Sequence, residues 1–222
     1  MSSALILFTP VIFGALFVYF FKPTKGQTQL LLSFSGAFLL AITISHLMPE
    51  VFNGENLHIE YYIVAGLLIQ LIMDYFSKGA EHGHLHTKND RLSKVLFTSL
   101  CLHAFIEGIP VANEEHHELL WAIVVHKIPI TIVIASFLLH IQSKFRYGLI
   151  ILLIFATMSP LGSLAGTYLP IISSYKNEIT ALIIGVFLHI STIIIFESTE
   201  NHRFNIAKFG AILLGFLIAL AI

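Results

Sequence analysis

The stretch Cys101–Pro110 reads CLHAFIEGIP and places a histidine and a carboxylate inside a segment apolar enough to cross a membrane. Ionisable side chains at membrane depth cost roughly 2.5 to 3.5 kcal/mol each on insertion scales, so they usually mark a pathway or a site. His103 and Glu107 are four residues apart and share one face of a helix. An imidazole nitrogen and a carboxylate oxygen placed in this way can bind one cation. The stretch therefore predicts a functional helix buried in a membrane protein.

The composition of the whole chain agrees with a membrane protein. Of its 222 residues, 56% are hydrophobic and 11% are charged, and its mean hydropathy is +0.86. A soluble domain of this length carries about 25% charged residues. The net charge of -1 and the lack of a basic stripe exclude nucleic acid as a partner. Cys101 is the only cysteine, so no intrachain disulfide forms, and we expect it to pack as a small apolar residue.

Short polar breaks divide the chain into eight apolar segments, each near the length of about 20 residues that a spanning helix needs. Because the only long connection runs from Ser77 to Leu92, we expect one polytopic membrane domain over residues 1–222. The first segment, Ala4–Phe21, is expected to be a retained spanning helix, since no basic residue precedes it. The predicted spans are 3–21, 29–51, 60–77, 92–112, 118–140, 147–169, 178–198 and 205–222.

Basic residues predict the orientation of these spans. Ten of the 12 Lys and Arg residues lie in or beside the odd-numbered loops, whereas Lys176 alone lies in an even-numbered loop. Positive residues near helix ends are retained on the cytoplasmic side. We therefore expect a cell-membrane protein with both termini outside the cytoplasm and the loop 78–91 inside it. The acidic and histidine-rich cluster Glu114–Glu118, in an even-numbered loop, either concentrates cations at the mouth or is simply solvated.

Ionisable residues are concentrated in the second, fourth, fifth and seventh predicted helices, each of which carries a histidine and another charged side chain. A membrane bundle turns such groups inward and shows lipid its apolar helices. The predicted fold class is therefore an all-α integral membrane bundle of eight transmembrane helices. Helices two, four, five and seven form its inner layer, and helices one, three, six and eight surround them.

A proline follows the histidine in three of the inner helices. Proline offers no N–H to the carbonyl four residues before it and pushes that carbonyl away. Carbonyls freed at membrane depth often line a wet cavity or an ion site. The three pairs are His46 with Pro49, His103 with Pro110, and His126 with Pro129. Their repetition favours an ion pathway over a packed core.

These motifs resemble those of the ZIP family of divalent metal transporters. Its members carry His-Leu-x-Pro-Glu on the second helix, His-Asn-x-x-Asp/Glu-Gly on the fourth and His-Glu-x-Pro-His-Glu on the fifth. The matching residues are His46–Glu50 for the second helix, His103, Glu107 and Gly108 for the fourth, and His126 and Pro129 for the fifth. Ser159–Gly162 and Gly185–Leu188 also resemble the family, so the similarity spans the whole chain.

The resemblance implies a transporter, not an enzyme, that moves a divalent metal ion into the cytoplasm. Its implied ligands are His46, His103, Glu107 and His126. Three imidazoles and one carboxylate favour Zn²⁺ as substrate, or Fe²⁺, Mn²⁺ or another first-row cation, over Mg²⁺ or Ca²⁺. The metal ion and the lipid bilayer are the expected partners, and the oligomeric state is left open, a homodimer included.

Further residues are candidates for the pathway or for charge compensation, and they are Glu50, Lys127, His189 and Glu197. His189 and Glu197 either line the route inward or are satisfied inside the core. Family members also have a histidine-bearing cytoplasmic loop, which His82, His84 and His86 supply here. These three imidazoles either hold an arriving ion briefly or belong to a solvated loop.

The chain departs from the family pattern around a second metal position. Ala104 stands in place of Asn, Lys127 in place of Glu, and Ile130 and Thr131 in place of the second His and Glu. Because several family members bind two neighbouring metals, these changes imply a site for one metal. One hypothesis is that the Lys127 ammonium takes the place of the missing ion and neutralises Glu107. The alternative is that Lys127 extends to the outer membrane interface.

Two other functions compete with transport. A ZIP-like pseudo-transporter or sensor would bind metal at the substituted site without conducting it. An intramembrane metallohydrolase would use a His/Glu zinc site to activate water. The hydrolase is the weaker alternative, because Lys127 and Ile130 break the His-Glu-x-x-His spacing of zinc proteases.

Overall fold

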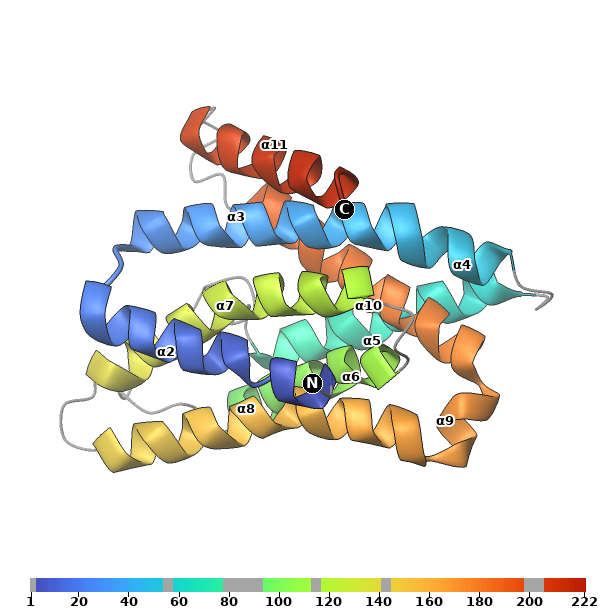
Figure 1. Cartoon of the computed structure of the whole chain (residues 1–222), viewed down its shortest axis with the longest axis horizontal. Coiled ribbons are helices and arrows are strands. Elements are labelled where there is room, and N and C mark those ends of the chain that lie inside the picture. The colour runs from blue at the N-terminus through green and yellow to red at the C-terminus, as the bar shows by residue number, and fades with distance from the viewer. Residues whose placement is uncertain (1–2, 54–57, 78–93, 113–116, 141–144, 198–205) are drawn as a thin grey trace.

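A computed structural model describes residues 3–53, 58–77, 94–112, 117–140, 145–197 and 206–222 of the chain. Every regular element in these ranges is a helix (Figure 1). The helices are α1 (Ser3–Ile6), α2 (Thr9–Phe21), α3 (Lys25–Ile42), the π-helical turn η1 (Thr43–Leu47), α4 (Met48–Phe52), α5 (Ile59–Ser77), α6 (Lys94–Gly108), the 3-10 turn η3 (Ile109–Ala112), α7 (His117–His140), α8 (Phe145–Tyr168), α9 (Pro170–Ser174), α10 (Lys176–Glu197) and α11 (Ile206–Leu220).

Seven stretches of the described chain are helical, long and apolar enough to cross a membrane, and they agree with the first seven predicted spans. The all-helical membrane bundle is therefore confirmed. The eighth predicted span corresponds to α11, which has 15 residues. At 1.5 Å per residue it is about 22 Å long, shorter than the hydrocarbon core of about 30 Å. An eighth crossing stays a prediction.

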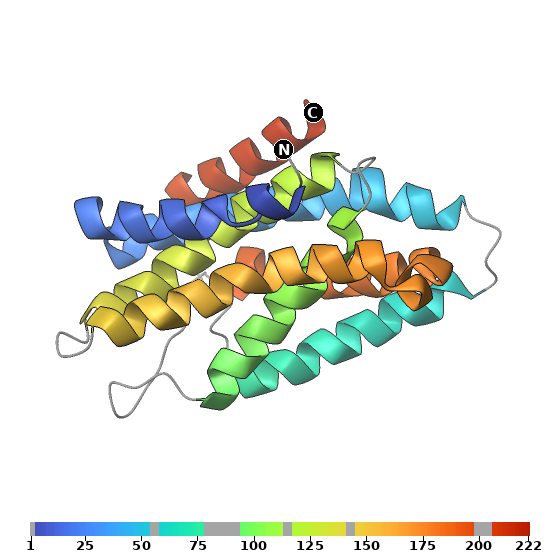
Figure 2. The ribbon, with the colours of Figure 1, turned by 60° about the horizontal axis from the view of Figure 1, so that its bottom comes forward.

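The helices pack in two groups. In the first group α10 lies against α5 and α3, and α11 lies on α3; in the second, α8 lies against α6, and α2 against α7. Contacts of α3 with α7 and of α5 with α6 join the two groups. Figure 2 shows α6 running obliquely across the bundle between α5 and α8. The hydrophobic core lies where the two groups meet, with α7 at its centre.

Burial largely follows the predicted inner and outer layers. In the spanning stretch of α7, 78% of the residues are buried, and in that of α3 with α4 the share is 61%. In the stretches that contain α2 and α5, only 28% and 22% of the residues are buried. The sixth predicted span, α8, is the most buried of the outer helices, because half of the residues in its spanning stretch are buried, as in α6. Its other side exposes apolar residues such as Leu149, Leu153 and Leu164, so α8 lies in the outer layer with one side packed on α6.

Two glycines explain how closely α8 approaches α6. A Cβ atom on Gly108 would clash with the carbonyl oxygen of Ser159, and one on Gly162 would clash with that of Phe105. Only residues without a Cβ permit this backbone contact. The close approach places Ser159 of α8 directly beside α6, the helix that carries His103 and Glu107.

Candidate metal centre

Three buried side chains converge at the centre of the bundle. His103 and Glu107 come from α6, and His126 comes from α7. His103 Nε2 lies 2.9 Å from Glu107 Oε1, and His126 Nε2 lies 3.6 Å from the same oxygen. Each side chain is at most 1% exposed. The three predicted ligands that sequence spacing placed on two helices are therefore brought together in space.

The spacing of these atoms fits a first-row divalent cation. One ligand atom from each residue lies within 4.8 Å of the others. Around a tetrahedral zinc ion with bonds of about 2.0 to 2.2 Å, neighbouring ligand atoms are about 3.3 Å apart. The two contacts with Glu107 Oε1, 2.9 and 3.6 Å, bracket that value. Small side-chain adjustments would thus admit one ion among the three ligands.

The local structure of α6 and α7 orients the ligands. His103 and Glu107 are one helical turn apart, and their direct contact aligns the imidazole with the carboxylate. The rings of His103 and His126 are nearly perpendicular, at 79° with centroids 6.4 Å apart. The Nε2 atom of each ring faces Glu107 Oε1. Pro110 lies in η3, just beyond the end of α6, whereas α7 continues through Pro129.

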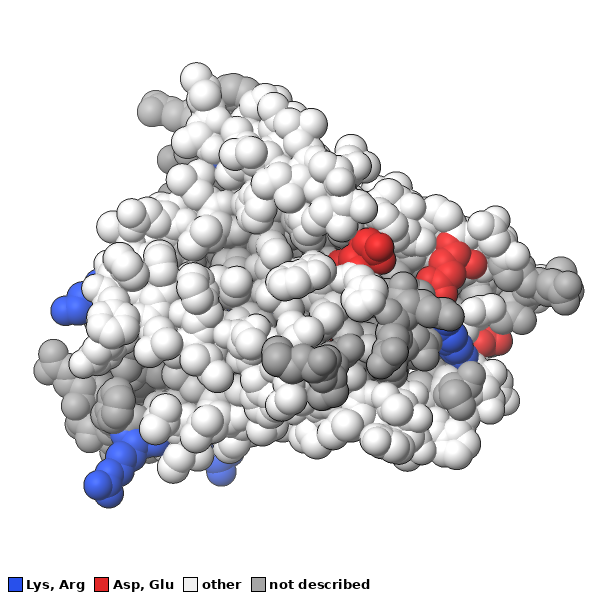
Figure 3. All heavy atoms as spheres, in the orientation of Figure 1, with Lys and Arg blue, Asp and Glu red and all other residues white. Residues whose placement is uncertain are grey.

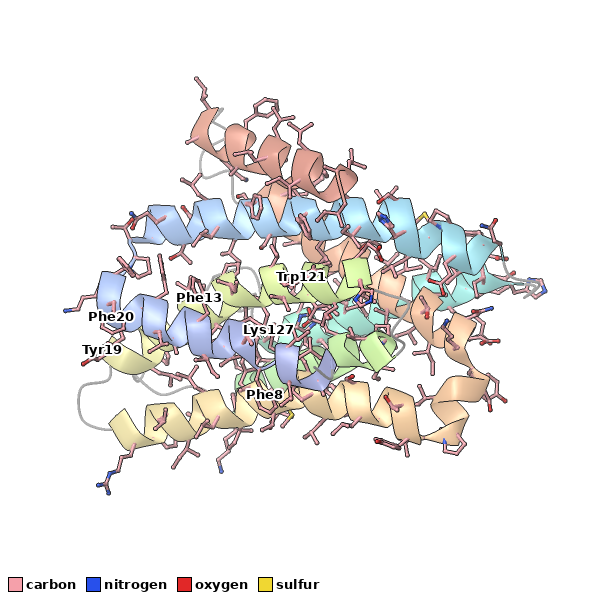
Figure 4. The ribbon with its side chains drawn as sticks, viewed as in Figure 1. Phe8, Phe13, Tyr19, Phe20, Trp121 and Lys127 are labelled. Carbon is pink, nitrogen blue, oxygen red and sulfur yellow. The ribbon has the colours of Figure 1, made fainter. Side chains whose placement is uncertain are left out.

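Lys127 is buried beside this group, with 1% of its surface exposed. Figure 4 shows it on α7 in the middle of the bundle. Its ammonium donates a hydrogen bond to Ser159 Oγ of α8 and lies 4.9 Å from the centre of the Phe155 ring. Ser159 in turn donates to the carbonyl of Ala104 at 2.6 Å. The burial excludes the alternative in which Lys127 extends to the membrane surface.

The hydrogen bond of Lys127 corrects one detail of the sequence hypothesis. Glu107 pairs with His103 and His126, whereas the Lys127 ammonium bonds Ser159. Lys127 follows His126 directly, so its side chain is turned about 100° around α7 toward α8. Any compensation of the Glu107 charge by Lys127 acts without direct contact between the two. The serine and the aromatic ring that hold the lysine were not predicted.

The structure does not bring His46 into the buried group of three. His46 lies in η1, is partly exposed, and its Nδ1 is 2.8 Å from Ser45 Oγ. Glu50, one turn later, pairs with Lys176 at 3.4 Å. The role of His46 as a fourth ligand of the central ion stays a prediction.

His189 lies in a different polar contact. Its Nε2 is 4.0 Å from Asp74 Oδ2 of α5, and Gln70, one turn before Asp74, is fully buried. The contact joins α10 to α5 and is separate from the three ligands. The side chain of Glu197 and the loop residues His82, His84 and His86 lie outside the described residues.

Comparisons with known proteins agree with this geometry. A family model described as ZIP zinc transporter matches residues 77–222. A comparison with curated proteins found no match. The matched region is more than half of the chain and contains α6, α7, α8 and α10, with all three converging ligands. The chain therefore belongs to the ZIP zinc transporter family.

Proposed function

We propose that this protein carries a divalent metal cation, with Zn²⁺ the favoured substrate, across the cell membrane into the cytoplasm. The observation that carries the proposal is the convergence of His103, Glu107 and His126, all buried, inside a bundle of membrane-length helices. Two imidazoles and one carboxylate suit Zn²⁺ and other first-row cations better than Mg²⁺ or Ca²⁺. The buried carboxylate offsets part of the charge of the ion inside the bilayer.

Several contacts support a site for a single ion. Lys127 stands where the family pattern has a glutamate of the second metal position, and its buried ammonium, bonded to Ser159, would repel another cation nearby. Ile130 and Thr131 offer no carboxylate or imidazole, and the Thr131 hydroxyl is engaged with the Lys127 carbonyl at 2.8 Å. We therefore expect one tightly bound ion per chain.

The direction of transport is inferred from the distribution of charge. Figure 3 shows Lys and Arg mainly at the end of the bundle where α2 ends and α8 begins, and Asp and Glu toward the opposite end, around α4 and the start of α10. Positive residues are retained on the cytoplasmic side. An acidic entrance outside the cell would attract divalent cations toward the pathway.

Flux into liposomes tests the proposal. Purified protein is reconstituted, Zn²⁺ is added outside, and a zinc-sensitive dye inside reports its entry. We expect flux from the unaltered protein and none from His103→Ala, while Lys94→Gln, a change to an exposed lysine at the start of α6, keeps it. No flux from the unaltered protein would overturn the transport proposal.

The same experiment identifies the second candidate, a metal sensor. The full burial of all three ligands is the observation that favours it, because a non-conducting protein has no need to open its site. A sensor would bind Zn²⁺ through His103 and Glu107 and show no flux.

A further inference from the structure

A second histidine and glutamate pair lies near the end of the helix that runs from Lys25 to Phe52. His46 and Glu50 are four residues apart and therefore lie on one side of this helix. Both are partly exposed, in contrast to the buried ligands of α6 and α7. The turn η1 that carries His46 contacts α10 and α7, the helix that carries His126. This pair lies before the region matched by the family model.

The backbone around His46 is locally altered. Pro49 has no N–H to offer the carbonyl of Ser45, so the regular ladder of helical hydrogen bonds is broken at this point. The N–H of Met48 instead bonds the carbonyl of Thr43, five residues back, which makes η1 a π-helical turn. Such turns occur frequently at functional sites, because they rotate one side chain out of the α-helical register.

The hydrogen bonds of Ser45 fix the tautomer of His46. The Ser45 hydroxyl has one hydrogen, which it donates to the Ala41 carbonyl at 2.7 Å. The 2.8 Å contact between Ser45 Oγ and His46 Nδ1 must then use a hydrogen on Nδ1. A neutral imidazole with hydrogen on Nδ1 keeps its lone pair on Nε2. His46 is thus held with Nε2 ready to bind a cation, the arrangement that metal-ligating histidines commonly show.

Lys176 pairs with Glu50 although its positive charge lies at two unfavourable positions, a helix N-terminus and a loop on the side where basic residues are scarce. It is the first residue of α10, where a positive charge opposes the helix dipole. It is also the single basic residue of the even-numbered loops, on the side where positive residues are scarce. Its ammonium is 3.4 Å from Glu50 Oε1, with side-chain exposures of 36% and 31%. Ion pairs this exposed contribute little stability, so another cation can displace the lysine.

We propose that His46 and Glu50 form a second divalent-cation site at the outer mouth, and that the Lys176 ammonium occupies the Glu50 carboxylate until a divalent cation displaces it. A divalent ion can bind the carboxylate and the His46 imidazole together, whereas lysine pairs with the carboxylate alone. A monovalent alkali ion binds imidazole poorly and has only one positive charge to attract the carboxylate, so it does not displace the lysine. The location at the outer mouth rests on the orientation proposed above, but the site itself does not.

Zinc binding to the purified full-length protein tests the site without requiring transport. In the His103→Ala variant, whose central site is disabled, a calorimetric titration should show one remaining Zn²⁺ that binds more weakly than the central ion. Adding His46→Ala or His46→Gln to this variant should abolish that binding. Adding Lys176→Gln should strengthen it about 2- to 5-fold, the range expected when an exposed ion pair no longer competes.

A matched change serves as the control in the same His103→Ala background. Lys94→Gln removes the charge of an exposed lysine at the start of α6, as Lys176→Gln does at the start of α10. It should not change the weak binding. The proposal is wrong if the His103→Ala variant binds no Zn²⁺, if the weak site survives loss of His46, or if Lys176→Gln leaves its affinity unchanged.

Flux measurements separate this proposal from the transport function. If the protein conducts Zn²⁺, His46→Ala should raise KM and leave the maximal rate nearly unchanged, because capture is weakened while His103, Glu107 and His126 are intact. A fall in the maximal rate would instead make His46 a fourth ligand of the central ion and overturn its role in a separate site. An unchanged KM would show that the site is not on the path. If the unaltered protein shows no flux, the transport function fails, and the binding titrations alone decide whether the mouth site exists.

Discussion

Two pairs in this protein have the same histidine-x-x-x-glutamate spacing and different surroundings. His103 and Glu107 are in contact at 2.9 Å and buried, and His126 of a neighbouring helix contacts the same carboxylate. His46 and Glu50 are partly exposed, and Glu50 pairs with Lys176 at 3.4 Å. Spacing alone therefore places two side chains on one helix face. The neighbouring helices determine whether the pair is buried and which other side chains contact it.

The difference in burial implies a difference in binding strength. Electrostatic attraction between an ion and its ligands is several-fold stronger in a buried site than near water. The central pair is thus suited to select an ion, and the outer pair to exchange one rapidly. The predictions below test this contrast, beginning with the change that should have the largest effect.

Glu107→Gln should reduce Zn²⁺ affinity and flux by more than about 100-fold, since even the loss of an outer partner of a metal ligand costs 10- to 100-fold. The amide has nearly the same shape but no charge, and Glu107 is the acceptor shared by both histidines. Glu60→Gln, a change to an exposed carboxylate, is the control. Normal Zn²⁺ affinity in the Glu107→Gln variant would show that the carboxylate is not a ligand.

Gly162→Ala should lower the free energy of unfolding by about 3 kcal/mol, at the upper end of overpacking effects. The new Cβ would clash with the Phe105 carbonyl oxygen, and a backbone atom in a helix cannot rotate away. Thermal unfolding in detergent measures the loss. Gly210→Ala, where no atom lies within 4 Å of the new Cβ, should be neutral or slightly stabilising. Equal melting temperatures for the two variants would contradict the close contact of α6 and α8.

Ser159→Ala should weaken Zn²⁺ binding at the central site about tenfold, which corresponds to the roughly 1.5 kcal/mol of a hydrogen bond to a charged group. The change leaves the Lys127 ammonium without its acceptor and the Ala104 carbonyl without its donor. Ser33→Ala, at a buried serine bonded within its own helix, is the control. If Ser159→Ala and Ser33→Ala bind Zn²⁺ equally well, the lysine does not need the serine to hold the central site.

Sequence reasoning named the three residues that converge in the structure because their pattern is local. A four-residue interval places His103 and Glu107 on one face, and the cost of burying them at membrane depth indicates that they have a function. It did not find the contact of Lys127 with Ser159, because these residues are 32 positions apart and on different helices. Nor could it tell that His46, with an identical interval to its glutamate, lies outside the central group.

The layers and spans show the same division between local and distant information. Apolar length predicts each helix separately, and seven of the predicted spans are long enough in the described chain. The burial of α8 depends on the contact of Gly108 with Ser159, which no single segment reveals. The partner of His189, Asp74, likewise comes from a distant helix. Only the packing of helices against one another supplies these facts.

Ser45→Ala should have the smallest effect of the four changes, a loss of about 2- to 5-fold in Zn²⁺ affinity at the outer pair, as expected for one hydrogen bond near the surface. Without the hydroxyl, His46 loses the acceptor that holds the hydrogen on Nδ1, so its ring turns more freely. The central site should keep its affinity, because the Ser45 hydroxyl bonds Ala41 and His46 and not the central ligands.

The measurement is a Zn²⁺ titration of Ser45→Ala in the His103→Ala background, which reports the outer pair alone. Ser45→Thr keeps a hydroxyl at the same position and should restore the affinity. A loss in the Ala variant that Thr repairs means that the outer histidine is preorganised by its neighbour. If Ala and Thr variants behave alike, the ring of His46 needs no such support, and burial alone separates the two pairs.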